Sequence, residues 1–167
     1  MNIRQKNLRK LMVTPLFSAC SFILCTFVVF PNMAPFQHFV NVLAGVIIGP
    51  WYAFAAALLT GLLRMMTGRS ILSVIGAIFG ALLSGYFYKY TKKIYMAFLG
   101  EVIGTGIISA LVSYPVMRYV IGLPLDKFYY YIPFFLPSAA MGGALGMVLL
   151  YRFKKTGQLA YWLEKLN

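Results

Sequence analysis

Three polar side chains open an otherwise apolar segment of the chain. Gln37, His38 and Asn41 lie within the run APFQHFVN, and His38 is the single histidine of the 167-residue sequence. Residues four apart share one face of a helix, so Gln37 and Asn41 would point the same way, with His38 beside them. Amide and imidazole groups on an apolar background can hold a small molecule by hydrogen bonds. A histidine at a helix end is also typical of an interfacial residue that binds nothing, and both interpretations remain open.

Aromatic and hydroxyl groups further along the chain could complete such a site. Tyr114 precedes Pro115, and the run YYYIPFFLPS contains Tyr130 and Ser138. Flat apolar rings with a few donors are the usual lining of a pocket for a small aromatic molecule. Tyrosines at a membrane surface also form aromatic belts without any ligand. We expect the substrate-binding residues to be Gln37, His38, Asn41, Glu101, Tyr114, Tyr130 and Ser138.

Patterns typical of catalysis and metal binding are missing from the sequence. The acidic residues Glu101, Asp126 and Glu164 are far apart, and one histidine cannot supply a pair of imidazole ligands. There is no Gly-x-x-x-x-Gly-Lys-Ser/Thr loop to bind ATP and no Gly-x-Ser-x-Gly turn to present a nucleophile. We therefore expect a protein that is not an enzyme, has no metal or cofactor, and does not bind ATP through such a loop.

The composition indicates an integral membrane protein. Hydrophobic residues make up 61% of the chain, charged residues 11%, and the mean hydropathy is +0.80. Such a composition cannot provide a soluble globule with a polar surface. The net charge of +12 is explained by basic loops that set orientation and contact lipid headgroups. We expect the lipid bilayer, and not nucleic acid, as the partner of these charges.

Apolar runs interrupted by proline and glycine define the expected helices. The run from Leu11 to Leu63 has no charged residue and is too long for one membrane span. Pro31, Pro35 and the Gly49-Pro50 pair divide it. We expect an all-α fold in which residues 1–167 form one transmembrane domain of six helices, at residues 11–30, 36–48, 51–66, 71–89, 94–119 and 128–151. The second helix is short, so it either ends inside the membrane or forms a re-entrant hairpin with the third.

Basic residues predict the orientation of this bundle. Eleven Lys and Arg residues fall in the amino terminus, the loop near residues 89–93 and the carboxyl-terminal tail, whereas four fall on the other side. Because Lys and Arg are enriched on the cytoplasmic side, both termini are expected there and residues 30–37 outside. The expected location is the bacterial plasma membrane, crossed several times.

Glu101 falls inside the fifth expected helix. A carboxyl group within a membrane span is costly and usually faces the bundle interior or a cavity. Thr105 lies one turn away on the same face. Glu101 is therefore either a buried structural partner of a hydroxyl or an arginine, or the floor of the ligand site.

Small side chains form a stripe along the first expected helix. Thr14, Ser18, Ser21 and Cys25 recur at helical spacing, and small residues let helices approach closely in lipid. The stripe can pack inside the same bundle, or it can be a docking face for another membrane subunit. Cys20 and Cys25 point in different directions around this helix, which argues against a disulfide between them.

Two blocks of the sequence carry a resemblance to a known family. APFQHFVNVLAGVIIGPWYA, from Ala34 to Ala53, and GEVIGTGIISALVSYPV, from Gly100 to Val116, resemble the most recognisable blocks of the ThiW family. Ala34 stands where the family pattern has Phe. In length and helix count the resemblance covers essentially the whole chain.

The resemblance implies a substrate-capture (S) component of an energy-coupling factor importer. It implies a pocket that opens outward and binds hydroxyethyl-methylthiazole, the thiazole precursor of thiamine, for salvage. A separate transmembrane T component and two cytoplasmic ATPases would supply energy, and the small stripe of the first helix would be the docking face. On this basis residues 31–35 would form an outer loop, with Gln37, His38 and Asn41 bonding the ligand and Tyr114 and residues 130–138 closing the opposite side.

Two other functions fit the same composition. One is a small membrane scaffold subunit without a ligand pocket. The other is a self-sufficient secondary transporter, although the sequence has no detectable internal repeat of the kind common in such proteins.

Overall fold

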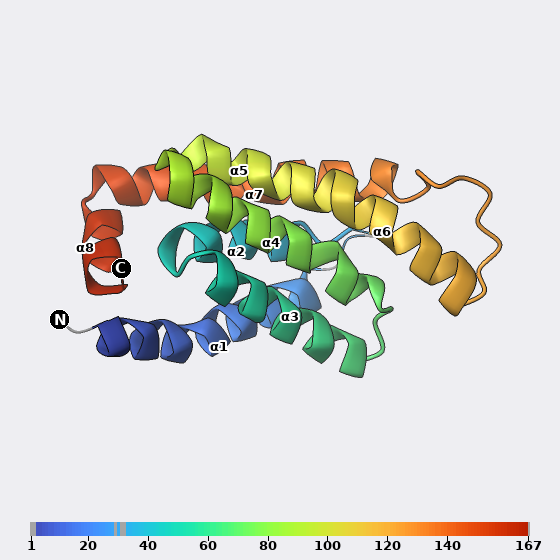
Figure 1. Ribbon diagram of the computed structural model, residues 1–167, viewed down its shortest axis with the longest axis horizontal. Coiled ribbons are helices and arrows are strands. Elements are labelled where there is room, and N and C mark those ends of the chain that lie inside the picture. The colour runs from blue at the N-terminus through green and yellow to red at the C-terminus, as the bar shows by residue number, and fades with distance from the viewer. Residues whose placement is uncertain (1–2, 29, 31–32, 167) are drawn as a thin grey trace.

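The computed structural model describes residues 3–28, 30 and 33–166, and its regular elements within these ranges are helices (Figure 1). The elements in chain order are α1 (Ile3–Phe27), α2 (Pro35–Ile47), α3 (Pro50–Met66), α4 (Leu72–Thr91), α5 (Ile94–Ile103), η1 (Gly104–Ser109), α6 (Ala110–Pro115), η2 (Val116–Val120), α7 (Ile132–Lys155) and α8 (Gln158–Leu166). The all-α expectation is confirmed. Pro31 and Asn32, in the expected outer loop, lie outside the described residues.

Four helices in the described ranges are long and apolar enough to cross a membrane: α1, α4, the continuous helix from Ile94 to Val120, and α7. The helices α2 and α3 have 13 and 17 residues. At ~1.5 Å per residue, α2 reaches only ~20 Å, which is shorter than the ~30 Å hydrocarbon core. Helices thus occur at all six expected places, and four of them have the length and hydropathy of a membrane span.

Several boundaries differ from the expected ones. The first helix begins at Ile3 instead of residue 11, because its basic residues continue the helical turn beyond the apolar segment. The last long helix begins at Ile132 and ends at Lys155, four residues later than expected at each end. A further helix, α8, follows Gly157 and packs Trp162 against Phe153, with ring centroids 4.9 Å apart.

The short helix α2 is the centre of the bundle. It contacts α1, α3, α4, α5, α7 and α8 (Figure 1). All of its residues are buried except Phe36 and Phe39, which are partly buried. Because buried polar groups need hydrogen-bond partners, the side chains of Gln37, His38 and Asn41 must find theirs on the surrounding helices.

Glycines bring α4 against the helix that carries Glu101. A Cβ atom on Gly80 would lie 2.6 Å from Glu101 Oε1 and closer still to Thr105 Oγ1. A Cβ on Gly104 would lie 2.6 Å from the carbonyl oxygen of Phe79. Real side chains do not tolerate such separations, so only glycine permits this helix spacing. The π-helical segment η1 starts three residues after Glu101, and such wider turns are frequent at functional sites.

The small stripe of α1 is buried within the chain, while its expected part as a docking face stays a prediction. Thr14, Ser18, Ser21 and Cys25 are the buried residues of α1. Thr60 of α3 donates a hydrogen bond that reaches Ser18 Oγ at 3.2 Å. These side chains pack between helices of the same chain, as the alternative interpretation held. Cys20 and Cys25 are both free thiols.

Candidate functional site

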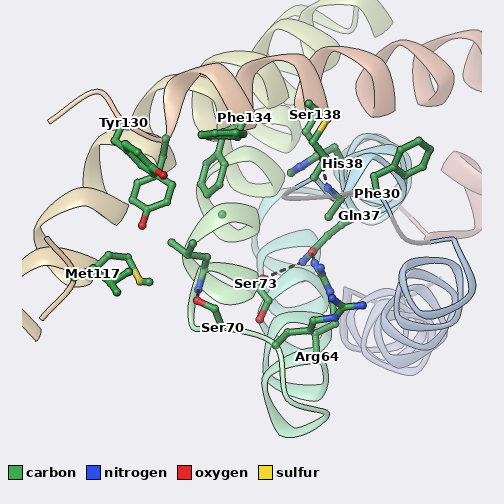
Figure 2. A pocket seen from close by; sticks show the side chains of 18 of the residues that line it. Phe30, Gln37, His38, Arg64, Ser70, Ser73, Met117, Tyr130, Phe134 and Ser138 are labelled. Carbon is green, nitrogen blue, oxygen red and sulfur yellow. Dashed lines mark hydrogen bonds between the residues drawn. The ribbon is translucent and has the colours of Figure 1, made fainter. Parts of the chain in front are cut away.

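A cavity of about 420 Å³ is seen from close by in Figure 2. The segments that line it lie at the end of the bundle opposite to α8 (Figure 1). Its wall is formed by the start of α2, the end of α3 and start of α4, the segment around η2, and the start of α7. The lining residues include Phe30, Ala34, Gln37, His38, Arg64, Arg69, Ser70, Ser73, Met117, Leu125, Tyr130, Tyr131, Phe134, Phe135 and Ser138. A volume of ~300–1,000 Å³ is typical of small-molecule pockets.

His38 is held by a carboxyl group beneath the cavity. Its Nδ1 atom lies 2.8 Å from Glu101 Oε1, and both residues are buried. Because Nδ1 is engaged with Glu101, the second ring nitrogen, Nε2, is the one available to a molecule in the cavity that His38 lines. The imidazole can act as donor or acceptor there, with its orientation fixed from below.

Glu101 is a shared hydrogen-bond partner of three side chains. Besides His38, Asn41 Nδ2 donates to Oε1 at 3.1 Å and Thr105 Oγ1 donates at 3.0 Å. Asn41 Nδ2 also donates to the carbonyl oxygen of Ala77 at 3.1 Å. Glu101 and Asn41 do not belong to the cavity lining. They form a polar layer directly under His38, in which Glu101 Oε2 has no hydrogen-bond partner among the described residues.

Gln37 links three elements at the other side of the cavity. Its Nε2 donates to the carbonyl oxygen of Ser73 at 3.3 Å, and its Oε1 accepts from Arg64. Ser73 Oγ in turn donates to the carbonyl oxygen of Gly61 at 2.9 Å. The Gln37 amide, which is 1% exposed, therefore joins α2 to α3 and α4 and fixes the position of the Arg64 guanidinium.

The start of α7 supplies an aromatic wall and one hydroxyl. Tyr130, Tyr131, Phe134 and Phe135 line this side, and the Tyr130 and Tyr131 rings meet edge to face at 5.1 Å. Ser138 Oγ accepts a hydrogen bond from the Ala34 amide at 2.9 Å, which ties α7 to the start of α2. Tyr131 directly precedes α7. Its pKa is raised mainly by burial and, to a smaller extent, by the electrostatic effect of neighbouring Tyr130. Its phenol therefore stays protonated and can donate.

The expected binding residues fall into three groups. Gln37, His38, Tyr130 and Ser138 line the cavity. Asn41 and Glu101 form the layer beneath it. Tyr114 is outside the lining, where its hydroxyl accepts a hydrogen bond from Arg118 at 2.6 Å.

Several lining residues were not among the expected binding residues. The most informative are Arg64, in the last turn of α3, and Arg69, in the loop between α3 and α4. Their clustering near the carboxyl end of α3 is visible in the sequence, but the contact of Arg64 with Gln37 depends on how α3 packs against α2. Met117, Leu125 and Phe135 carry no signal that distinguishes them from ordinary packing residues. Within the described part of the chain, no group of acidic, histidine and cysteine side chains could hold a metal.

Long apolar helices are typical of a multi-pass membrane protein, and the partly open cavity at one end of the bundle has the size of a small-molecule pocket. The family model described as thiamine-precursor transporter protein (ThiW) matches residues 11–156. The chain belongs to this family, a family of thiamine-precursor transporters. Neither the curated proteins nor the solved structures gave a match.

Proposed function

We propose that this protein is the substrate-capture component of an energy-coupling factor importer and binds hydroxyethyl-methylthiazole for thiamine salvage. The observation that carries the proposal is the cavity itself, which combines an aromatic wall on α7 with fixed polar groups on α2. Flat rings can stack on the planar thiazole, while a small number of oriented hydrogen bonds select its heteroatoms.

His38 and Gln37 have different parts in this proposal. The His38 ring, oriented by Glu101, offers Nε2 to the thiazole nitrogen or to the hydroxyethyl oxygen. Gln37 uses both ends of its amide inside the protein, so its main contribution is to position Arg64 and the neighbouring wall. Asn41 acts one layer below, since it bonds the same carboxyl oxygen as His38.

Import would require other subunits. The sequence contains no nucleotide-binding loop of the P-loop type, so we assign the energy to a transmembrane T component and two cytoplasmic ATPases. Both ends of the chain lie at one end of the bundle (Figure 1), which agrees with placing both termini in the cytoplasm. The cavity is at the other end and would open outside, in a protein of the bacterial plasma membrane.

Uptake of labelled thiazole tests the proposal. A bacterium that cannot make or import thiazole would express this chain alone, the T component with its ATPases alone, or all of them together. We expect accumulation only with all subunits, and loss of accumulation when the ATPases are inactivated. Accumulation by this chain alone would instead identify a self-sufficient secondary transporter, and no accumulation in any combination would contradict the proposal.

A further inference from the structure

The polar end of the cavity carries positive charge without a matching negative charge. Arg64 and Arg69 both belong to the lining. Among the described residues, the contact between a basic side chain and a carboxylate joins His38 to Glu101, so neither arginine contacts a carboxylate there. Glu101 is below the lining and is already hydrogen-bonded to three side chains.

The other two acidic residues lie outside the lining of the cavity. Asp126 and Glu164 are exposed, and neither belongs to the lining. Two arginines therefore line a partly open space whose lining contains no carboxylate. Of these two, within the described residues, Arg64 alone has a side-chain hydrogen-bond partner, the neutral amide oxygen of Gln37.

A partly buried guanidinium has a strong preference for an anion. Taking a charge out of water costs free energy that only a partner charge or several hydrogen bonds restore. The planar fork of arginine matches the paired oxygens of a carboxylate or a phosphate. One Gln37 oxygen uses only part of the five N–H donors of Arg64, which leaves donors for a bound group.

We propose that the ligand carries an oxyanion, a carboxylate or a phosphate ester on the heterocycle, that binds between Arg64 and Arg69. This inference rests on the proposed function, because it assigns a more specific substrate class to the same site. The heterocycle would lie against the aromatic wall of α7, and the anion would lie at the boundary of α3 and α4. Figure 2 shows Arg64 on the opposite side of the cavity from Tyr130 and Phe134.

The size of the cavity agrees with a ligand larger than the bare thiazole alcohol. About 420 Å³ is available, and pockets of ~300 Å³ upward already accept drug-sized molecules. A five-membered ring with a methyl and a hydroxyethyl group fills only part of this space. Its phosphate ester, carrying a charge of about −1.5 to −2, would extend from the ring wall to the arginines. The hydroxyls of Ser70 and Ser73 line the same end.

Calorimetric titration of the detergent-purified chain tests this inference. The ligands are hydroxyethyl-methylthiazole, its phosphate ester and a methylthiazole carboxylate, each in neutral detergent. We expect at least one of the two anions to bind at least ~10-fold more tightly than the neutral alcohol, because charge-assisted hydrogen bonds to arginine are stronger than neutral ones. Its affinity should also fall as salt increases, while that of the alcohol should not.

Charge-removing variants locate the anion. Arg69→Gln and Arg64→Gln should each reduce the ratio of anion affinity to alcohol affinity by ~10-fold. Lys127→Gln is the matched control, because this substitution also removes one positive charge. Lys127 is exposed and lies outside the cavity lining. This variant should leave the ratio unchanged. Arg69 is exposed at the end of a loop, so its variant serves if Arg64→Gln fails to fold.

The outcomes separate the two proposals. Equal or weaker binding of both anions, with saturable binding of the alcohol, would overturn the oxyanion and leave thiazole capture intact. Binding of none of the three ligands would count against thiazole capture itself. A last titration adds an anionic phospholipid to the detergent. If the lipid removes the difference in anion affinity between the wild type and the arginine variants, and excess phosphate ester does not restore it, the arginines bind lipid headgroups and the inference is wrong.

Discussion

Replacement of Glu101 by alanine should destabilise the whole bundle, because this carboxyl group connects α2 to α5 and η1. It is hydrogen-bonded to His38 at 2.8 Å, accepts from Thr105 at 3.0 Å and from Asn41 at 3.1 Å, and is fully buried. Asn41 keeps its bond to Ala77, and Thr105 can turn to the backbone carbonyl one turn earlier. The main loss is therefore the partner of His38.

The expected loss of stability in Glu101→Ala follows from the one side chain, His38, that loses its hydrogen-bond partner. A buried donor left without a partner costs ~1–3 kcal/mol, and truncation of a packed side chain adds the cost of a cavity, so we expect ~2–4 kcal/mol in total for Glu101→Ala. For a chain of this size, a loss of 1 kcal/mol lowers Tm by ~2–4 °C, which gives a decrease of ~5–15 °C. Glu101→Gln keeps an acceptor oxygen and should cost only ~1 kcal/mol.

Thermal unfolding in detergent, followed by far-UV circular dichroism, measures the difference. Glu164→Ala is the control, because it removes an exposed carboxyl group on α8 and should leave Tm unchanged. The expected order of Tm is wild type and Glu164→Ala, then Glu101→Gln, then Glu101→Ala. A Tm for Glu101→Ala equal to that of the wild type would refute the assignment of Glu101 as the shared acceptor.

Three further changes test other contacts. Ser18→Leu should lower Tm in the isolated chain, because Ser18 is 2% exposed between helices; an unchanged Tm with failed assembly would favour the docking interpretation. Gly80→Ala should lower Tm similarly, since its Cβ would collide with Thr105 Oγ1, and a stable variant would contradict the helix spacing. Gln37→Ala should weaken ligand binding by ~10-fold without reducing membrane insertion, because Arg64 loses its partner; calorimetry and the amount of protein in the membrane fraction check both parts.

The helix positions were largely predictable because their boundaries carry local signals. Pro35 marks the start of α2, and the Gly49-Pro50 pair marks the end of α2 and the start of α3, to within a residue or two. The helix α8 was missed because it is short and follows a polar segment; its stability depends on packing Leu159 and Trp162 against the bundle. Local sequence contains no information on such long-range contacts.

The candidate site was predictable in its residues but not in its connections. Gln37 and His38 were identifiable as polar groups in an apolar helix, and both line the cavity. The bond between His38 and Glu101 joins residues 63 positions apart, so it appears only when α2 and α5 are packed. The stripe around Ser18 was ambiguous for a related reason, since small residues pack equally well within a chain or between subunits.

The most direct test of the account is calorimetric titration of the purified wild-type chain and of His38→Ala with hydroxyethyl-methylthiazole. Thiamine and its pyrimidine precursor are the comparators. The account predicts saturable binding of the thiazole alone by the wild type, and affinity at least ~10-fold weaker in His38→Ala because a hydrogen bond in the cavity is lost. Absence of binding by a folded, ligand-free wild-type sample, or equal affinity in the variant, would contradict it.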